Sequence, residues 1–151
     1  YITEEKAEFL KRHNYDHGDV VICKLGDPTG KACIIPKEMQ PGRIVADIVR
    51  YRVNDSILFN EYLCFALNAP LSINQFNSEA TGMTRQRVNL SKMRELLFAL
   101  PPREEQQAIV EKVNSLMALC DELELQIETS QTQIDQLMQS CLQEVFQHES
   151  N

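Results

Sequence analysis

The sequence predicts a mixed α/β (α+β) globular domain over residues 1–100, followed by a long helix of coiled-coil type over residues 101–151. Short apolar runs separated by turn residues fill the first part, which is typical of a small domain of strands and short helices. Pro101-Pro102 ends that pattern. Beyond it, apolar residues recur at alternating intervals of four and three residues, which is the spacing of a coiled-coil seam.

Several short strands are predicted in the domain. Each is a run of apolar, often β-branched residues, with Gly, Pro, Asn or Asp at its ends. The predicted strands are residues 20–23, 32–35, 44–53 and 96–100. Because turn-forming residues 25–30 separate the first two, we expect a hairpin there, with the first strand buried on both faces.

Short helices are predicted around these strands. Their apolar residues recur on a helical period, and capping or breaking residues mark their ends. The predicted helices are residues 3–12, 57–67, 71–80 and 91–95. In the first we expect Phe9 and Leu10 to face the interior, and in the third we expect Leu71, Ile73 and Phe76 to do so.

The long helix is expected from about residue 103 to about residue 147, because Pro102 suits a first turn and Glu104 and Glu105 suit the positive end of the helix dipole. Apart from Ser130, the seam is apolar. The residues expected to mediate helix pairing are Ile109, Val113, Leu116, Leu123, Ile127, Ile134 and Leu137, with Cys120 and Cys141 completing the seam. The sequence contains no second helix of this length, so we expect the partner helix to come from another chain, as in a homodimer, or from a part of the protein outside this sequence.

Charge is distributed unevenly between the two parts. Residues 1–100 hold 13 Lys and Arg against 12 Asp and Glu, whereas residues 101–151 hold 2 against 10. Residues 85–94 carry basic side chains and no acidic ones. A locally basic domain is compatible with contact to nucleic acid, although a solvated charged face has the same composition.

No catalytic constellation is visible, so we expect a non-enzymatic protein without a cofactor or metal of its own. The segment Gly26 to Lys31 lacks both the spacing and the following Ser or Thr of a Walker phosphate loop. The three histidines do not cluster. The five cysteines are widely spaced, and we expect them to be buried small apolar residues in a reducing cytoplasm. No apolar run is long enough to span a membrane.

Residues 82–89 carry the side chains that read DNA bases. Arg pairs with guanine in the major groove, and Gln and Asn pair with adenine. The candidates for base contact are Arg85, Gln86, Arg87 and Asn89, and those for the phosphate backbone are Thr84 and Lys31. An ordinary polar surface loop has the same composition, so this alternative stays open at this point.

The order of these motifs resembles the specificity subunit of type I restriction-modification systems. The resemblance rests on Gly82, Thr84 and Val88-Asn89-Leu90, then on Leu100-Pro101-Pro102-Arg103-Glu104-Glu105-Gln106 before a long helix. Upstream, Gly18-Asp19-Val20-Val21-Ile22 is similar to that family's target recognition domain. The family's Gly-x-Thr-Gln-Pro stretch corresponds here to Gly82-Met83-Thr84-Arg85-Gln86, which has no proline. A full member has two recognition domains and two spacer helices, whereas this chain has one of each. We also expect the recognition domain here to be N-terminally incomplete, because it begins midway through the family's pattern.

The resemblance implies a bacterial or archaeal cytoplasmic protein without catalytic activity of its own. A recognition domain of the family reads one half of a bipartite double-stranded DNA target, and the helices pair as a ruler between the halves. The partners it implies are adenine-methyltransferase (modification) subunits, which use S-adenosylmethionine, and a restriction subunit, which uses ATP and Mg²⁺. The acidic helix residues Glu111, Asp121 and Glu122 are then candidates for contact with the methyltransferase.

Two other interpretations remain open. The chain could be the recognition segment of a single-chain restriction-methyltransferase, in which catalytic domains precede it in the same polypeptide. It could also be a coiled-coil dimerisation or scaffold module without a DNA role. This last interpretation predicts that replacing Arg85 and Arg87 by alanine leaves every function of the protein unchanged.

Overall fold

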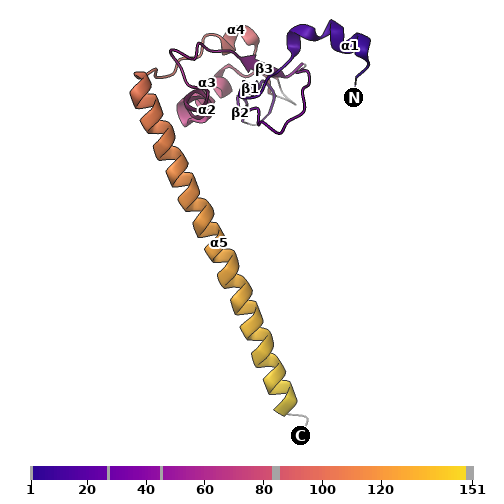
Figure 1. Ribbon diagram of the computed structural model, residues 1–151, viewed down its shortest axis with the longest axis vertical. Helices are drawn as coiled ribbons and strands as arrows, with labels where there is room; N and C mark the ends of the chain where they lie inside the picture. The colour runs from indigo at the N-terminus through magenta and orange to yellow at the C-terminus, as the bar shows by residue number, and fades with distance from the viewer. Residues whose placement is uncertain (1, 27, 45, 83–85, 149–151) are drawn as a thin grey trace. The chain divides into compact units, whose positions relative to one another are not determined.

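The computed structural model describes residues 2–26, 28–44, 46–82 and 86–148, with side chains described up to residue 143. The chain forms two compact units, Tyr1–Val110 and Glu111–Asn151. The first contains a small sheet and short helices, and most of the long helix α5 (Arg103–His148) forms the second (Figure 1). The mixed α/β class with a long C-terminal helix is thereby confirmed. The domain boundary between residues 100 and 101 stays a prediction.

Three antiparallel strands form the sheet, in the order β2-β1-β3. The central strand β1 (Val20–Cys23) pairs with β2 (Ala32–Ile34) on one side and with β3 (Ile48–Tyr51) on the other. Val20 and Ile22 are fully buried, because a central strand in this sheet has covering elements on its apolar face. The hairpin is confirmed, although its loop covers residues 24–31 and is longer than expected.

The short helices lie close to their predicted positions. They are α1 (Glu4–Phe9), the 3₁₀ helix η1 (Lys11–His13), α2 (Asn60–Asn68), α3 (Pro70–Glu79) and α4 (Leu90–Met93). In Figure 1, α2 and α3 lie beside the sheet, and α2 packs on both β1 and β2. The core between them contains Ile22, Leu63, Leu67 and Phe76.

Two predicted inward-facing residues lie on the surface instead. Phe9 is 79% exposed, and the ammonium of Lys6 lies 5.1 Å from the centre of its ring. Leu71 is 66% exposed, because the fully buried positions of α3 are Ser72 and Phe76. The hydroxyl of Ser72 donates to the carbonyl of Ala66 at 2.6 Å, which turns that face of α3 towards α2.

The strand predicted over residues 96–100 does not form. The segment has no regular secondary structure, and side chains bond to its backbone in place of a neighbouring strand. The amide side chain of Gln75 both accepts from the Leu97 N–H (3.1 Å) and donates to the Leu97 carbonyl (2.8 Å). The hydroxyl of Tyr62 donates to the Ala99 carbonyl at 2.8 Å. Burial raises the pKa of this phenol, with Glu105 adding to the effect, so the hydroxyl stays a donor.

The expectation of buried cysteines is wrong for three of the five. Cys33, Cys120 and Cys141 are exposed, whereas Cys23 and Cys64 are partly buried. Cys33 faces outwards on the edge strand β2, and the other two exposed thiols lie on α5. Burial raises the pKa of the Cys64 thiol, which keeps it protonated. Within the described ranges, no helix has both the length and the apolar character that a membrane crossing requires.

The loop of the first hairpin packs directly on α3. Gly30 has a φ of +86°, and its α-carbon approaches the ring of Phe76 so closely that no side chain fits. The neighbouring Thr29 is fully buried, and both its N–H and its hydroxyl donate to the side-chain oxygen of Asn77, at 3.2 and 3.1 Å. These contacts fix the position of the loop relative to the core.

The first turns of α5 are anchored in the Tyr1–Val110 unit by one buried amide. Gln106 is 1% exposed, and its side-chain oxygen accepts from the Phe59 N–H at 3.0 Å. Its nitrogen donates to the carbonyls of Ile57 (2.9 Å) and Pro101 (2.8 Å). The guanidinium of Arg103 stacks 3.9 Å from the centre of the Phe59 ring. The Leu-Pro-Pro-Arg-Glu-Glu-Gln string therefore has a structural role at this junction.

Candidate DNA-recognition surface

The segment with the predicted base-reading residues is a second, short hairpin. Thr81 and Arg87 exchange two backbone hydrogen bonds of 3.0 and 2.9 Å, which close the hairpin at its base. Val88, the next residue, is 1% exposed and anchors the hairpin in the core. Gln86, the described polar residue next to Arg87, is therefore held at the surface by a fixed base.

The loops of the two hairpins are joined through their backbones. Leu25 and Arg87 form an antiparallel bridge. On either side of it, the Gly26 N–H donates to the Gln86 carbonyl (3.3 Å) and the Val88 N–H donates to the Lys24 carbonyl (3.0 Å). The first loop thus supports the hairpin that carries the candidate residues.

The structure locates four of the six predicted contact residues. Gln86 is exposed. Lys31 is exposed immediately before β2, where its carbonyl accepts from the Cys23 N–H at 3.0 Å. Asn89 is exposed, but its side-chain oxygen caps α4 by accepting from the Ser91 N–H at 3.3 Å. Thr84 and Arg85 lie outside the described residues. The roles of all six in DNA contact stay predictions.

Arg87 is held by a carboxylate from another part of the sequence. Its guanidinium lies 2.8 Å from the side-chain oxygen of Asp47, and the Arg87 side chain remains 56% exposed. The pair orients the guanidinium at the surface. It also means that the acceptor of any ligand at Arg87 has to compete with this carboxylate or share the guanidinium with it.

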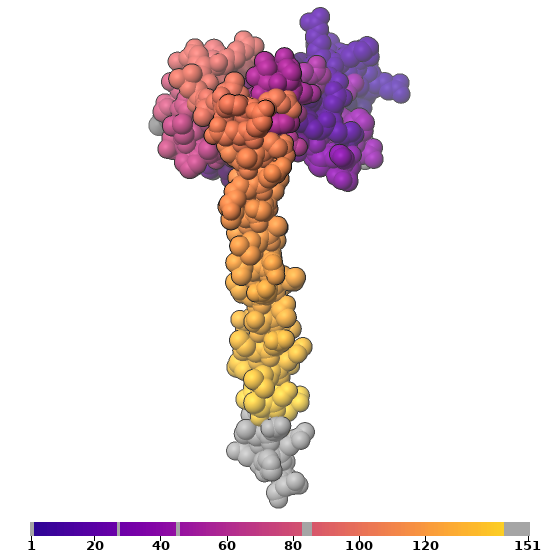
Figure 2. Space-filling view, turned by 60° about the vertical axis from the view of Figure 1, so that its left-hand side comes forward, coloured from indigo at the N-terminus to yellow at the C-terminus, as the bar shows by residue number. Residues whose placement is uncertain are grey.

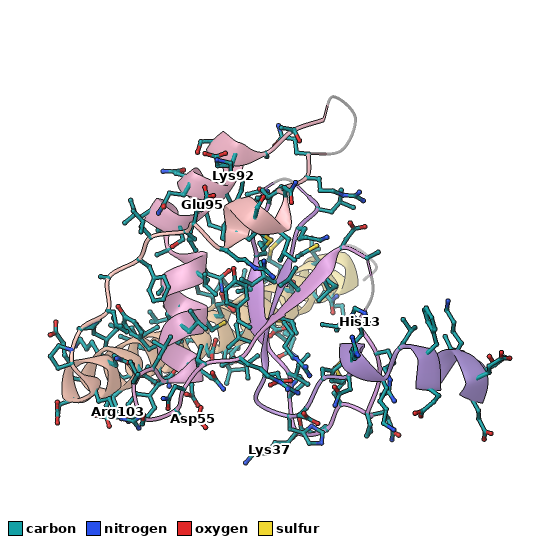
Figure 3. All side chains as sticks on the ribbon, turned by 90° about the horizontal axis from the view of Figure 1, so that it is seen from above. His13, Lys37, Asp55, Lys92, Glu95 and Arg103 are labelled. Atoms are coloured by element: carbon teal, nitrogen blue, oxygen red, sulfur yellow. The ribbon has the colours of Figure 1, made fainter. Side chains whose placement is uncertain are left out.

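Lys92 is neutralised by two acids, one nearby in the sequence and one on α3. Its ammonium lies 3.2 Å from Glu95 and 3.5 Å from Glu79, and Figure 3 shows Lys92 and Glu95 next to each other. The hydrogen bond that Lys92 donates to the Glu95 carboxylate raises the pKa of Lys92, and Glu79 adds to the effect. The acid-free stretch of the sequence is therefore less basic in the fold than it is along the chain.

The predicted pairing residues divide between the two units. Ile109 packs against the core of the Tyr1–Val110 unit, and Val113 is partly buried. The remaining five are exposed by about half or more of their surface: Leu116, Leu123, Ile127, Ile134 and Leu137. Further exposed apolar residues, among them Leu119 and Met138, widen this surface beyond a single seam. The exposed apolar side chains of the second unit all belong to α5, which is coloured orange to yellow in Figure 2.

Nothing in the described ranges resembles a metal centre, since no group of three or more His, Cys, Asp or Glu side chains gathers there. The chemistry of the surface consists of amides, a guanidinium and lysines. These groups recognise a ligand by hydrogen bonds and charge.

Several specificity subunits of type I restriction enzymes are similar to this chain. That of EcoBI from Escherichia coli is 24% identical over 148 residues, which are 98% of this chain and 31% of the relative. That of StySPI from Salmonella potsdam is 30% identical over 104 residues, 67% of this chain and 22% of the relative. That of EcoEI from E. coli is 23% identical over 128 residues, 81% of this chain and 22% of the relative.

The chain thus spans between about a fifth and a third of the length of the relatives it matches. A family model described as the type I restriction modification DNA specificity domain matches residues 2–131, which include the sheet, both hairpins and most of α5. The match over this length shows that the chain belongs to the family of type I restriction-modification DNA specificity domains.

Proposed function

We propose that the chain reads one half of a bipartite target in double-stranded DNA, as the non-catalytic specificity component of a type I restriction-modification complex. The observation that supports this proposal is the backbone bonding of Gln86 and Arg87 to Gly26, Leu25 and Thr81, which holds both side chains exposed at the surface of a family member. Amide and guanidinium groups held at a fixed position are what base recognition in the major groove needs.

The helical part has two proposed roles. The exposed apolar surface of α5 pairs with another helix, and in this chain alone it forms a homodimer with a second copy. The acidic residues Glu111, Asp121 and Glu122 contact a methyltransferase subunit, which carries the S-adenosylmethionine chemistry. A restriction subunit joins the same complex, in the cytoplasm of a bacterium or archaeon.

A map of methylated adenines across the source genome tests the function. We expect one bipartite motif to lose its methylation when the gene is deleted, and to regain it when the gene is restored. Unchanged methylation in a strain whose methyltransferase subunits are active would contradict the proposal. The mapped motif also supplies the duplex for binding measurements.

Replacing Arg85 and Arg87 by alanine is expected to weaken binding to that duplex by about 1–3 kcal/mol for each lost base contact and to relax specificity. Because Asp47 loses its partner in this variant, adding Asp47→Asn separates the loss of contact from repulsion between carboxylate and DNA. Lys37→Ala is a control, since this exposed lysine lies on another segment. Equal affinity of the double variant and the control in fluorescence anisotropy would remove the base-reading role.

Substituting lysine for both Leu123 and Ile127 is expected to abolish self-association of the chain, because the charges would be buried in the helix pair. Static light scattering over a micromolar concentration range measures this. Thr129→Lys with Thr132→Lys adds the same two charges on the outer face and should leave association intact. A wild-type chain that stays monomeric at high micromolar concentration would contradict homodimerisation.

A further inference from the structure

A basic hollow lies beside the 81–87 hairpin and has no role in the base contacts proposed above. Its volume is about 290 Å³. Arg12 and His13 from η1 and Lys24 from the end of β1 line it, together with apolar side chains that include Ile44 and Val49. The charged side chains that line the hollow in the described part of the chain are Arg12, Lys24 and Arg50, and all three are basic.

The acidic side chains of the neighbouring segments are engaged with other residues. Arg50, which also lines the hollow, has its guanidinium 3.2 Å from the carboxylate of Asp19, and both side chains are largely buried. Asp47 is paired with Arg87 at 2.8 Å. Among the described residues, the ion pairs include neither Arg12 nor Lys24. These two charges are therefore available to a ligand.

The backbone of Lys24 places the hollow next to the recognition hairpin. Its N–H donates to the carbonyl of Asp47 at 2.7 Å, and its carbonyl accepts from the N–H of Val88 at 3.0 Å. Leu90, which follows the hairpin at the start of α4, lines the hollow as well. A ligand that contacts Gln86 and Arg87 and continues past Lys24 would therefore pass over this hollow.

We propose that the hollow binds a sugar-phosphate unit of the DNA backbone that flanks the bases contacted by the hairpin. Arg12 and Lys24 neutralise the phosphate, as cations do in most protein contacts to DNA backbone. The apolar floor, with Ile44 and Val49, packs against the deoxyribose. The inference rests on the proposed function, and it adds a contact that positions the DNA without reading its sequence.

The test compares the wild-type subunit, in its complex with the methyltransferase subunits, with the variant Arg12→Gln plus Lys24→Gln. The two probes are a duplex with the mapped motif and a duplex in which both half-sites are scrambled. We expect the variant to bind both duplexes about tenfold more weakly or worse, and the slope of log K against log salt concentration to become less steep by about 1–2. The preference for the motif over the scrambled duplex should stay unchanged.

Lys37→Gln with Lys11→Gln removes the same charge outside the hollow, and Figure 3 shows Lys37 well apart from His13. Affinity and slope equal to this control would overturn the inference while the proposed function stands. A variant that loses its methyltransferase subunits on a sizing column, with unchanged affinity for DNA, would overturn it in favour of a protein contact. An unchanged thermal midpoint and recovery of affinity in Arg12→Lys plus Lys24→Arg would confirm that charge, and not misfolding, is responsible.

If the wild-type complex does not distinguish the two duplexes, the proposed function fails. The salt slope on the scrambled duplex then still decides the inference: a less steep slope in the variant than in the control supports a phosphate contact, and equal slopes overturn it.

Discussion

Replacing Gly30 by alanine is expected to lower the free energy of unfolding of the Tyr1–Val110 unit by about 3–4 kcal/mol, from overpacking together with an unfavourable φ. A Cβ at this position would lie 2.7 Å from Cε2 of Phe76 and nearer still to Cγ and Cδ2. Phe76 is 2% exposed in the core, so the ring cannot move away without disturbing α3. Urea unfolding followed by tyrosine fluorescence measures the change, since all four tyrosines lie in this unit and the chain has no tryptophan.

Gly18→Ala is the matched control for this experiment. Gly18 has nearly the same backbone conformation, with a φ of +83°, but nothing lies within 4 Å of a Cβ built there. The control should therefore show only the cost of the left-handed conformation, about 1–2 kcal/mol. An equal loss of unfolding free energy in both variants would mean that the clash with Phe76 does not contribute to the destabilisation.

Replacing Gln106 by alanine is expected to destabilise the same unit by about 3 kcal/mol, because buried hydrogen-bonding groups lose their partners. The substitution removes the acceptor for the Phe59 N–H and the donor to the carbonyls of Ile57 and Pro101. It also leaves a space in a fully buried position. The same urea titration measures the effect.

The chain offers two controls for Gln106. Gln126→Ala makes the identical change at an exposed site of α5 and should alter stability by no more than about 0.5 kcal/mol. Gln106→Glu keeps an acceptor for Phe59 but removes both donors, and it places a carboxylate next to two carbonyl oxygens. We expect it to be at least as unstable as the alanine variant, and a stable glutamate variant would contradict the assigned hydrogen bonds.

Elements with a strong local signal could be predicted from the sequence. The apolar run of β1, the helical periods of α2 and α3 and the seam of α5 depend on neighbours a few residues apart. The segment 96–100 has an equally apolar composition, yet its backbone bonds go to the side chains of Gln75 and Tyr62. These partners are far away in the sequence, so no local pattern could indicate them.

The candidate site shows the same division between local and distant information. The exposure of Gln86 and Arg87 could be predicted, because polar residues between a Gly and an apolar anchor form surface turns. The pairing of Arg87 with Asp47 and of Lys92 with Glu79 could not, since each joins separate segments. The capping role of Asn89 had a local signal, a short helix that begins immediately after it.

If the 81–87 hairpin reads DNA as proposed, the backbone bridge between Leu25 and Arg87 limits how its target sequence can be changed. A graft of residues 81–89 alone would place a foreign hairpin on a loop whose shape was matched to the original one. The hydrogen bonds that Gly26 and Lys24 now make to Gln86 and Val88 would then have no matching partners in the foreign hairpin. Residues 24–31 and 81–89 therefore have to be exchanged together, as one cassette assembled from two distant stretches of the gene.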